Sequence, residues 1–288
     1  MSSIQTMKAW AIEVKEDQSI PEVFQQTARQ ILEDCKTFPY TIYAPRNRKT
    51  GKPAWDHLLM MTETTVWILE DHDKKVAIAQ IPMDGIQSIQ MGTVLLQSWI
   101  KLCGKSPAGP ECVVLYYDTV MGELFIPVME NLRRKMIKIS NDNREPQADE
   151  LDYLKEISLK FYNYGKQSLL PGQRICRSAY QPQSGDLDKT AHADHVTAPH
   201  LTILTDEELI IIQETEQAEE SATQKYSGIW THIPVDKIEE VEATSLQESQ
   251  WEKMSLQFLD QKPVEIVFDP DNHEAIEKLI KQLKLLLK

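Results

Sequence analysis

The sequence predicts a mainly β, α+β protein in which one folding unit occurs twice in tandem. Three observations predict this class. Short apolar blocks recur in the same order in both halves of the 288-residue chain. Within each half, the apolar residues first follow the period of strands and then that of a helix. A polar stretch at residues 140–149 separates the halves, and a chain of this length suffices for two domains of ordinary size.

The clearest recurrence pairs HLLMMTETTVWIL, at residues 57–69, with HLTILTDEELIII, at residues 200–212. Each block has a His, a short apolar run, a Thr, polar residues and a second apolar run, so that Thr62 stands opposite Thr205. Internal repeats are sought first because a missed repeat misassigns the whole fold. The polar segment inside each block is typical of the turn between two strands of a hairpin.

Three further pairs of blocks keep the same order along the chain. They are 41–45 with 178–182, 81–89 with 233–241, and 113–127 with 254–268. The distance between matching blocks grows after the hairpins, which we attribute to a polar insertion at residues 214–224. Residues 92–109 are expected to be a longer intervening region of the first copy.

Helical segments are predicted around each set of strands. Segments 21–36 and 148–169 precede the copies, and an amphipathic helix ends each copy, with Asp271 and Glu274 at capping-box spacing in the second. The apolar stripes of the final helices comprise Val128, Leu132, Met136 and Ile137 in the first copy, and Ile276, Leu279, Ile280, Leu283, Leu286 and Leu287 in the second. We therefore expect two domains, 1–146 and 147–288, each with a helix, about seven antiparallel strands and a C-terminal helix.

This plan resembles the pleckstrin-homology-like (PH-like) family. Two blocks are similar to its bacterial members: an apolar strand running into Thr-Asp or Thr-Glu, and an I-P-x-D-x-I segment at the start of a later strand. The resemblance covers most of residues 38–138 and 173–287. It implies two tandem PH-like barrels, each capped by its C-terminal helix, and a non-enzymatic binding or scaffolding role. A protein or peptide is the expected partner, and association of the chain with itself stays open.

Composition limits the other classes of function. The formal net charge is −13, which argues against nucleic acid as a partner and against broad attraction to anionic membranes. The N-terminal residues lack a signal-peptide pattern, and no apolar run approaches the length of a membrane span, so we expect a cytoplasmic protein. The cysteines have no CxxC spacing and are expected to be reduced and mostly buried; they are Cys35, Cys103, Cys112 and Cys176.

One basic loop stands out in this acidic chain. Residues 45–53 carry the basic side chains of Arg46, Arg48, Lys49 and Lys52. In PH domains that bind inositol phosphates, the corresponding loop holds the phosphates, and Arg and Lys suit that task. Recognition of an anionic ligand or a membrane phosphate is therefore our second hypothesis. An exposed, solubilising loop is the alternative that we favour, because the matching loop of the second copy is acidic and bacterial members are not generally tied to phosphoinositides.

Other motifs give weaker signals. HADH at 192–195, near His200, has ligand-type residues, but its polar surroundings favour a solvated loop, so we predict no metal. GKS at 104–106 lacks the Gly that a phosphate-binding loop needs at position 99. No catalytic motif is present, so we predict no enzyme and no cofactor. The lysines of 278–288 suit a membrane-surface helix, but a helix that covers the sheet explains the same pattern.

Overall fold

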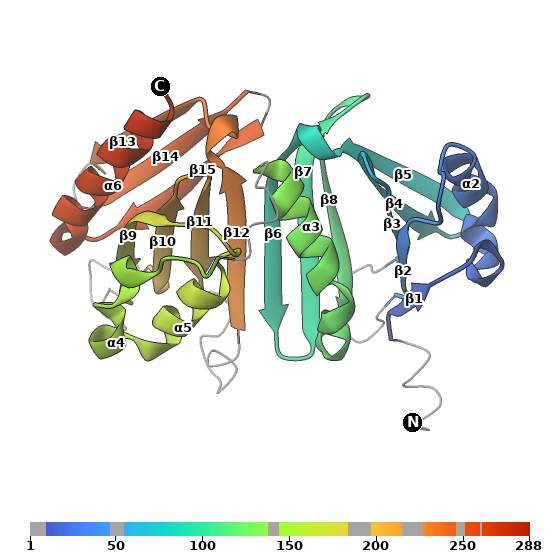
Figure 1. The fold of residues 1–288 in the computed structure, drawn as a ribbon, viewed down its shortest axis with the longest axis horizontal. Helices are drawn as coiled ribbons and strands as arrows, with labels where there is room; N and C mark the ends of the chain where they lie inside the picture. Colours follow the sequence, from blue (N-terminus) through green and yellow to red (C-terminus); the bar gives the residue numbers. More distant parts are fainter. Residues whose placement is uncertain are drawn as a thin grey trace, which may run out of the picture. The chain divides into compact units, whose positions relative to one another are not determined.

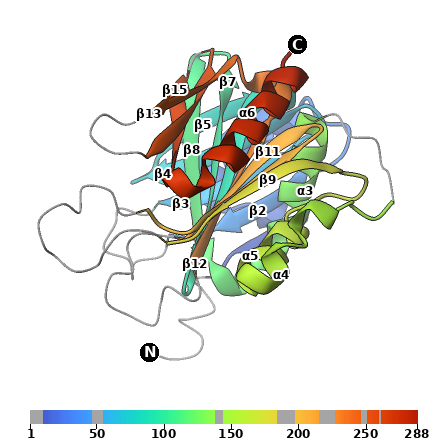
Figure 2. The same ribbon diagram turned by 90° about the vertical axis from the view of Figure 1, so that its left-hand side faces the viewer.

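The computed structural model describes residues 10–46, 55–137, 144–183, 197–214, 227–245, 251–259 and 261–288. The chain divides into two compact units, residues 1–136 and 137–288. In Figures 1 and 2, unit 1 is coloured from blue to green and unit 2 from yellow-green to red. Both are mainly β with a few helices, and the strand pairs are antiparallel, so the predicted α+β class is confirmed.

Unit 1 begins with a short strand and a helix, continues through seven strands and ends in a helix. The first elements are β1 (Ile12–Val14), η1 (Asp17–Ser19) and α2 (Glu22–Leu32). The first sheet has the order β1-β2-β3-β4-β5, with β2 (Tyr40–Ala44), β3 (Asp56–Met61), β4 (Thr65–His72) and β5 (Lys75–Pro82). After η3 (Met83–Gly85) come the meander β6 (Ile86–Val94), β7 (Gln97–Ser106) and β8 (Gly109–Asp118), then η4 (Thr119–Leu124) and α3 (Ile126–Met136).

Unit 2 repeats this plan. Its opening helical segments are η5 (Asp149–Leu151), α4 (Leu154–Ile157) and α5 (Leu159–Gln167). Four paired strands follow: β9 (Ile175–Gln181), β10 (His200–Thr205), β11 (Glu208–Gln213) and β12 (Ser227–Pro234). After η7 (Val235–Lys237) come the sheet β13 (Glu240–Ser245), β14 (Glu252–Phe258) and β15 (Gln261–Phe268), then η8 (Pro270–Asn272) and α6 (His273–Leu286).

Neither unit forms a closed barrel within the described strands. The first sheet of unit 1 stops at β1 and β5, and the β13–β15 sheet of unit 2 has its own two edges. A small sheet with free edges needs another element to cover its apolar face. In unit 2 this element is α6, which packs beside β9 and β13.

Strands β10 and β11 of unit 2 are covered on both faces, which explains the unbroken apolar run at residues 209–212 of β11. Ile210 and Ile212 of β11 point into a core formed with α4 and α5. Their neighbours Leu209 and Ile211 point into a second core, which α6 closes. Gly165 permits α5 to lie close to the sheet, since a Cβ there would meet side-chain carbons at 2.8–3.2 Å. Alternation of polar and apolar residues, the usual sign of a strand with one solvent-exposed face, is therefore absent from β11.

In unit 1 the opening helix α2 also packs against the sheet. Phe24, Ala28 and Ile31 of α2 are buried against Leu58 and Met60 of β3. The spacing of the three helical residues puts them on one face, so the predicted segment 21–36 is amphipathic for this reason.

The predicted stripe of α6 is confirmed, but its predicted cap is wrong. Ile276, Leu279, Ile280 and Leu283 are each at most 7% exposed, and Leu286 and Leu287 pack partly against the same core. The cap residue of α6 makes no side-chain hydrogen bond to the helix, and Glu274 pairs instead with Lys278 at 2.6 Å. The turn η8, absent from the sequence prediction, moves the start of the helix beyond Asp271.

The hairpins at Thr62 and Thr205 share their hydrogen bonds, which confirms the main internal match. The Thr62 hydroxyl accepts from the N–H groups of Thr64 and Thr65 and donates to the Thr65 carbonyl, at 3.0–3.4 Å. The Thr205 hydroxyl makes the same three bonds two and three residues downstream, at 2.9–3.2 Å. Thr is needed because one hydroxyl both accepts from two amides and donates to a carbonyl.

The second match, IPMD with IPVD, is also confirmed. In each unit the Pro ends a strand and a 3-10 turn follows, η3 after Pro82 and η7 after Pro234. The first residue of each turn donates its N–H to the preceding hairpin at 2.8 Å, to Thr64 in unit 1 and to Glu207 in unit 2. The insertion predicted at 214–224 lies almost wholly outside the described residues.

The match of 113–127 with 254–268 is wrong. Residues 254–268 form most of the hairpin β14–β15, whereas 113–127 contain the end of β8, then η4 and the start of α3. Asp118 and Asp269 are the true counterparts, because each accepts a backbone N–H at the start of the turn before the last helix. Residues 92–109 are therefore not an extra region but contain β7. Strands with similar apolar patterns match one another even when the alignment is shifted by a whole strand.

The expectation of four reduced cysteines is wrong for two of them. Cys103 and Cys112 are direct cross-strand partners in β7 and β8 and form a disulfide, with Cα atoms 4.2 Å apart. Cys35 and Cys176 are free and half-buried. The spacing of Cys103 and Cys112 has meaning only once the hairpin between them is known.

Among the described residues, no helix is long and apolar enough to cross a bilayer.

Candidate functional site

A groove in unit 2 lies between α6 and the strands β13 and β14. Its volume is about 560 Å³. Ile276 and Ile280 contribute buried apolar surface from α6, while Leu285 is 55% exposed at its rim. Ala243 faces the groove from β13. The groove is thus bounded by an amphipathic helix on one side and a short sheet on the other.

The strand beside this groove is a sheet edge. Within the described part of unit 2, β13 pairs only with β14. Val241 is its one buried residue, and the other five are exposed. An edge strand presents alternate N–H and C=O groups that can pair with another extended chain. The groove therefore offers main-chain hydrogen bonds on one side and apolar side chains on the other.

The charges along the groove change sign. Lys281, Lys284 and Lys288 line it near the C-terminus of α6, and all three are exposed. Toward the other end stand Glu252 and Glu277, and Glu252 accepts from His273 at 2.5 Å. This hydrogen bond and the Glu252 charge raise the pKa of His273. Three lysines next to exposed apolar surface favour an acidic ligand at that end.

The basic loop is only partly within the described residues. Arg46 is described, and its backbone N–H donates to Asp56 Oδ1 at 2.7 Å. Tyr43 donates to the other oxygen of the same carboxylate at 3.0 Å, and burial together with that carboxylate raises the Tyr43 pKa. Arg48, Lys49 and Lys52 lie outside the described residues, as does the HADH segment at 192–195. The anionic-ligand hypothesis therefore stays a prediction.

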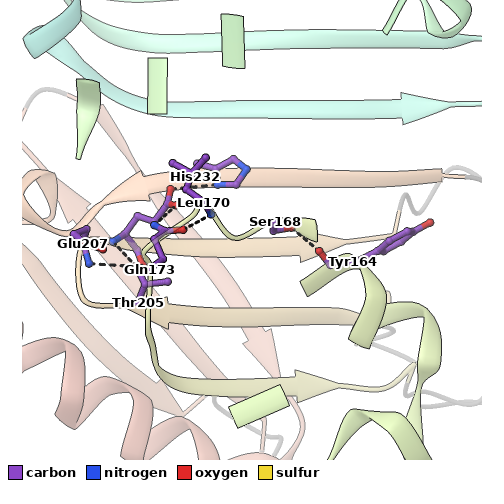
Figure 3. A network of polar contacts seen from close by, with 8 residues as sticks. Tyr164, Ser168, Leu170, Gln173, Thr205, Glu207 and His232 are labelled. Atoms are coloured by element: carbon purple, nitrogen blue, oxygen red, sulfur yellow. Dashed lines mark hydrogen bonds and ion pairs between the residues drawn. The ribbon is translucent and has the colours of Figure 1, made fainter. Parts of the chain in front are cut away.

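A cluster of polar side chains in unit 2 is buried (Figure 3). The Gln173 side chain accepts from the Leu170 N–H and donates to Glu208, each at 2.7 Å. Gln173 and Glu208 are both fully buried, and His232 approaches Glu208 at 3.3 Å. Burial and the neighbouring Asp206 raise the pKa of Glu207 to about 8. This cluster joins the loop before β9 to β11 and β12, so we assign it to folding rather than to ligand binding.

A cluster of polar side chains in unit 1 was not predicted from the sequence. Glu70 of β4 makes hydrogen bonds to His57 Nε2 at 3.0 Å and to His72 Nε2 at 2.9 Å. The bond with His57 is the main reason that the Glu70 pKa is lowered. Trp55 stacks on His72 with ring centroids 4.4 Å apart. A cross-strand pairing of β3 with β4, read from the hairpin register, would have revealed it. No group of three or more His, Cys, Asp or Glu side chains in the described residues is placed to hold a metal ion.

Comparison with known proteins adds no identity. No family model matches the chain, and no curated protein matches it at significant similarity. Among the described residues, the groove beside α6 combines accessibility, an edge strand and a cluster of lysines. The sequence showed the lysines of this helix but not the groove. The groove forms only because β13 lies next to α6 in the folded unit.

Proposed function

We propose that this protein is a non-enzymatic docking protein made of two tandem PH-like domains. In this proposal unit 2 binds an extended acidic peptide, which adds a strand to β13 and lies against α6. The observation that carries it is the groove between an edge strand and an amphipathic helix, lined by Lys281, Lys284 and Lys288.

The order of elements supports the PH-like assignment. Each unit has seven strands between an opening helix and a final helix, and the same hairpin and 3-10 turn recur in both units. In unit 2 the seven strands form one group of four and one of three. The final helix α6 covers the core between these groups.

The physical chemistry of the groove suits an added strand. Each new main-chain hydrogen bond contributes about 0.5–1.5 kcal/mol net. Alternate side chains of the added strand would point toward α6, where Ile280 and Leu285 provide apolar contact. Acidic side chains at one end would meet the lysines, which adds specificity and a faster association rate. A peptide with alternating apolar and acidic residues fits this arrangement best.

The test is selection of peptides from a random display library with the full-length chain as bait. We expect enriched peptides to alternate apolar and acidic residues. A labelled synthetic copy of the best peptide should then bind in fluorescence anisotropy. Methylation of alternate backbone nitrogens on its paired edge should abolish binding, because main-chain donors are lost while side chains remain.

Charge variants locate the site. The double variant Lys281→Glu/Lys284→Glu should weaken binding of the selected peptide at least tenfold. Lys278→Glu is the matched control, since Lys278 pairs with Glu274 and does not line the groove. Absence of any enriched peptide, or equal losses in both variants, would contradict the proposal.

A further inference from the structure

The disulfide of unit 1 joins two residues that the fold already holds together. Strands β7 and β8 pair over ten consecutive positions, from Gln97 with Asp118 to Ser106 with Gly109. At the turn, the Ser106 hydroxyl donates to the Gly109 carbonyl at 2.9 Å and accepts from the Ala108 N–H at 3.1 Å. Gly109 has a φ of +123°, which a residue with a side chain rarely adopts. The hairpin therefore has its own turn and ladder in addition to the disulfide.

The two cysteines differ in exposure. Cys103 is buried, with 5% of its surface exposed, whereas Cys112 is exposed. Attack by a thiolate on a disulfide requires access to one of the sulfurs. A thiolate from solvent can therefore reach Cys112 and not Cys103.

A pocket lies next to Cys112. Its volume is about 320 Å³, and Cys112 forms part of its wall together with Trp55, His57, Glu70, Glu111 and Tyr116. This volume is at the lower end of the range for small-molecule sites. The pocket thus offers room for the rest of a small thiol whose sulfur is bonded to Cys112.

We propose that Cys112 and Cys103 form a thiol–disulfide exchange site, in which Cys112 takes up a small neutral or cationic thiol and Cys103 expels it. In the reductive direction, the external thiolate attacks Cys112 Sγ and the bond to Cys103 breaks. Cys103 leaves with the electron pair and takes a proton. A second external thiol then releases the first as a disulfide, and Cys112 becomes a thiol. The oxidative direction reverses these steps, with the disulfide of the small thiol as the oxidant.

The charge of the pocket determines which thiol is preferred. Glu70 and Glu111 place two carboxylates in its wall, and the hydrogen bond from His57 favours the ionised form of Glu70. The net charge of the whole chain is also negative, at −13. A thiol that carries an ammonium group is attracted to this site, and one with several carboxylates is repelled.

The experiment uses the full chain with Cys35→Ser and Cys176→Ser, so that only the pair can react. Cystamine and oxidised glutathione are the two probes, and intact mass reports each adduct. With Cys103→Ser added, we expect one cysteamine adduct on Cys112. With Cys112→Ser added instead, the buried Cys103 should react at least tenfold more slowly.

Two further measurements test the preference for a cationic thiol and the stability of the reduced chain. The rate ratio of cystamine to oxidised glutathione should be at least fivefold larger at Cys112 than at Cys176, measured in a variant that retains only Cys176. Circular dichroism should stay unchanged when the disulfide of the otherwise unaltered chain is reduced. Equal rate ratios would overturn the preference for a cationic thiol. Unfolding on reduction, or no adduct on Cys112, would overturn the exchange site itself.

Discussion

Two histidines at matching positions show how a single neighbour decides the chemistry of a residue. His57 and His200 each begin the repeated block, and each stands directly opposite a residue of the next strand. For His57 that residue is Glu70, which bonds to its ring. For His200 it is Gln213, and the His200 ring packs instead against Phe268, with centroids 4.8 Å apart. Burial lowers the pKa of His200 to about 4.

The low pKa of His200 predicts a pH dependence of stability. Folded unit 2 keeps this imidazole neutral, whereas the unfolded chain binds a proton as pH falls below the ordinary pKa of 6.5. The free energy of unfolding should therefore decrease between pH 6.5 and about pH 4, by roughly 3 kcal/mol in total. The measurement is urea denaturation at several pH values for the wild type and His200→Gln. The difference between the two curves isolates this residue, and a difference that is independent of pH would contradict the prediction.

The hairpin threonines give a matched pair of substitutions. Thr205→Val keeps the shape of the side chain but leaves two backbone N–H groups without their acceptor in a fully buried position. We expect it to lower the stability of unit 2 by roughly 1–3 kcal/mol. Thr62→Val removes the same bonds at a partly exposed hairpin, where water replaces them, so its cost should be smaller. Equal losses in chemical denaturation would show that burial does not determine the difference.

At the scale of elements, α6 serves two surfaces. One side of the helix closes the core of unit 2, and an adjoining side borders the groove beside β13, with Ile276 and Ile280 common to both. Leu283 and Leu285 are two residues apart and lie on different sides, with 0% and 55% exposure. A helix that must complete a core and also face a ligand needs such a division, because each face has its own hydrophobic requirement.

This division predicts opposite outcomes for two similar substitutions. Leu283→Asp places a carboxylate in a fully buried apolar position and should unfold unit 2. Leu285→Asp should leave its stability within about 0.5 kcal/mol, because that side chain is already exposed. Thermal melts followed by limited proteolysis distinguish the two units. If Leu283→Asp also unfolds unit 1, the units do not fold independently.

At the scale of the molecule, the net charge of −13 opposes any general attraction to anionic surfaces. The full chain should not sediment with phosphatidylserine vesicles at about 0.15 M salt, where charges are screened beyond about 8 Å. The measurement is vesicle cosedimentation of the wild type. Binding that disappears when Arg46, Arg48, Lys49 and Lys52 are changed to Glu would instead support the anionic-ligand hypothesis.

Much of the architecture could be predicted from the sequence, since local patterns carry it. The Thr62 and Thr205 hairpins, the apolar stripe of α6 and the helix before each set of strands follow from spacing and turn chemistry. The last strands of each unit were misaligned, because their alternating patterns are alike. The basic loop was visible as a run of charge, but its spatial arrangement cannot be inferred from residue type.

The sequence by itself determined the duplication, the mainly β class and the amphipathic final helix, because these depend on residues close together in the chain. Only the tertiary structure decided which strands became edges, which side of α6 met β13, and that Cys103 lies opposite Cys112. Those features depend on strand register and on contacts between distant segments. A change of register by one residue exchanges the faces of a strand, so a site built across strands exists only once the register is established.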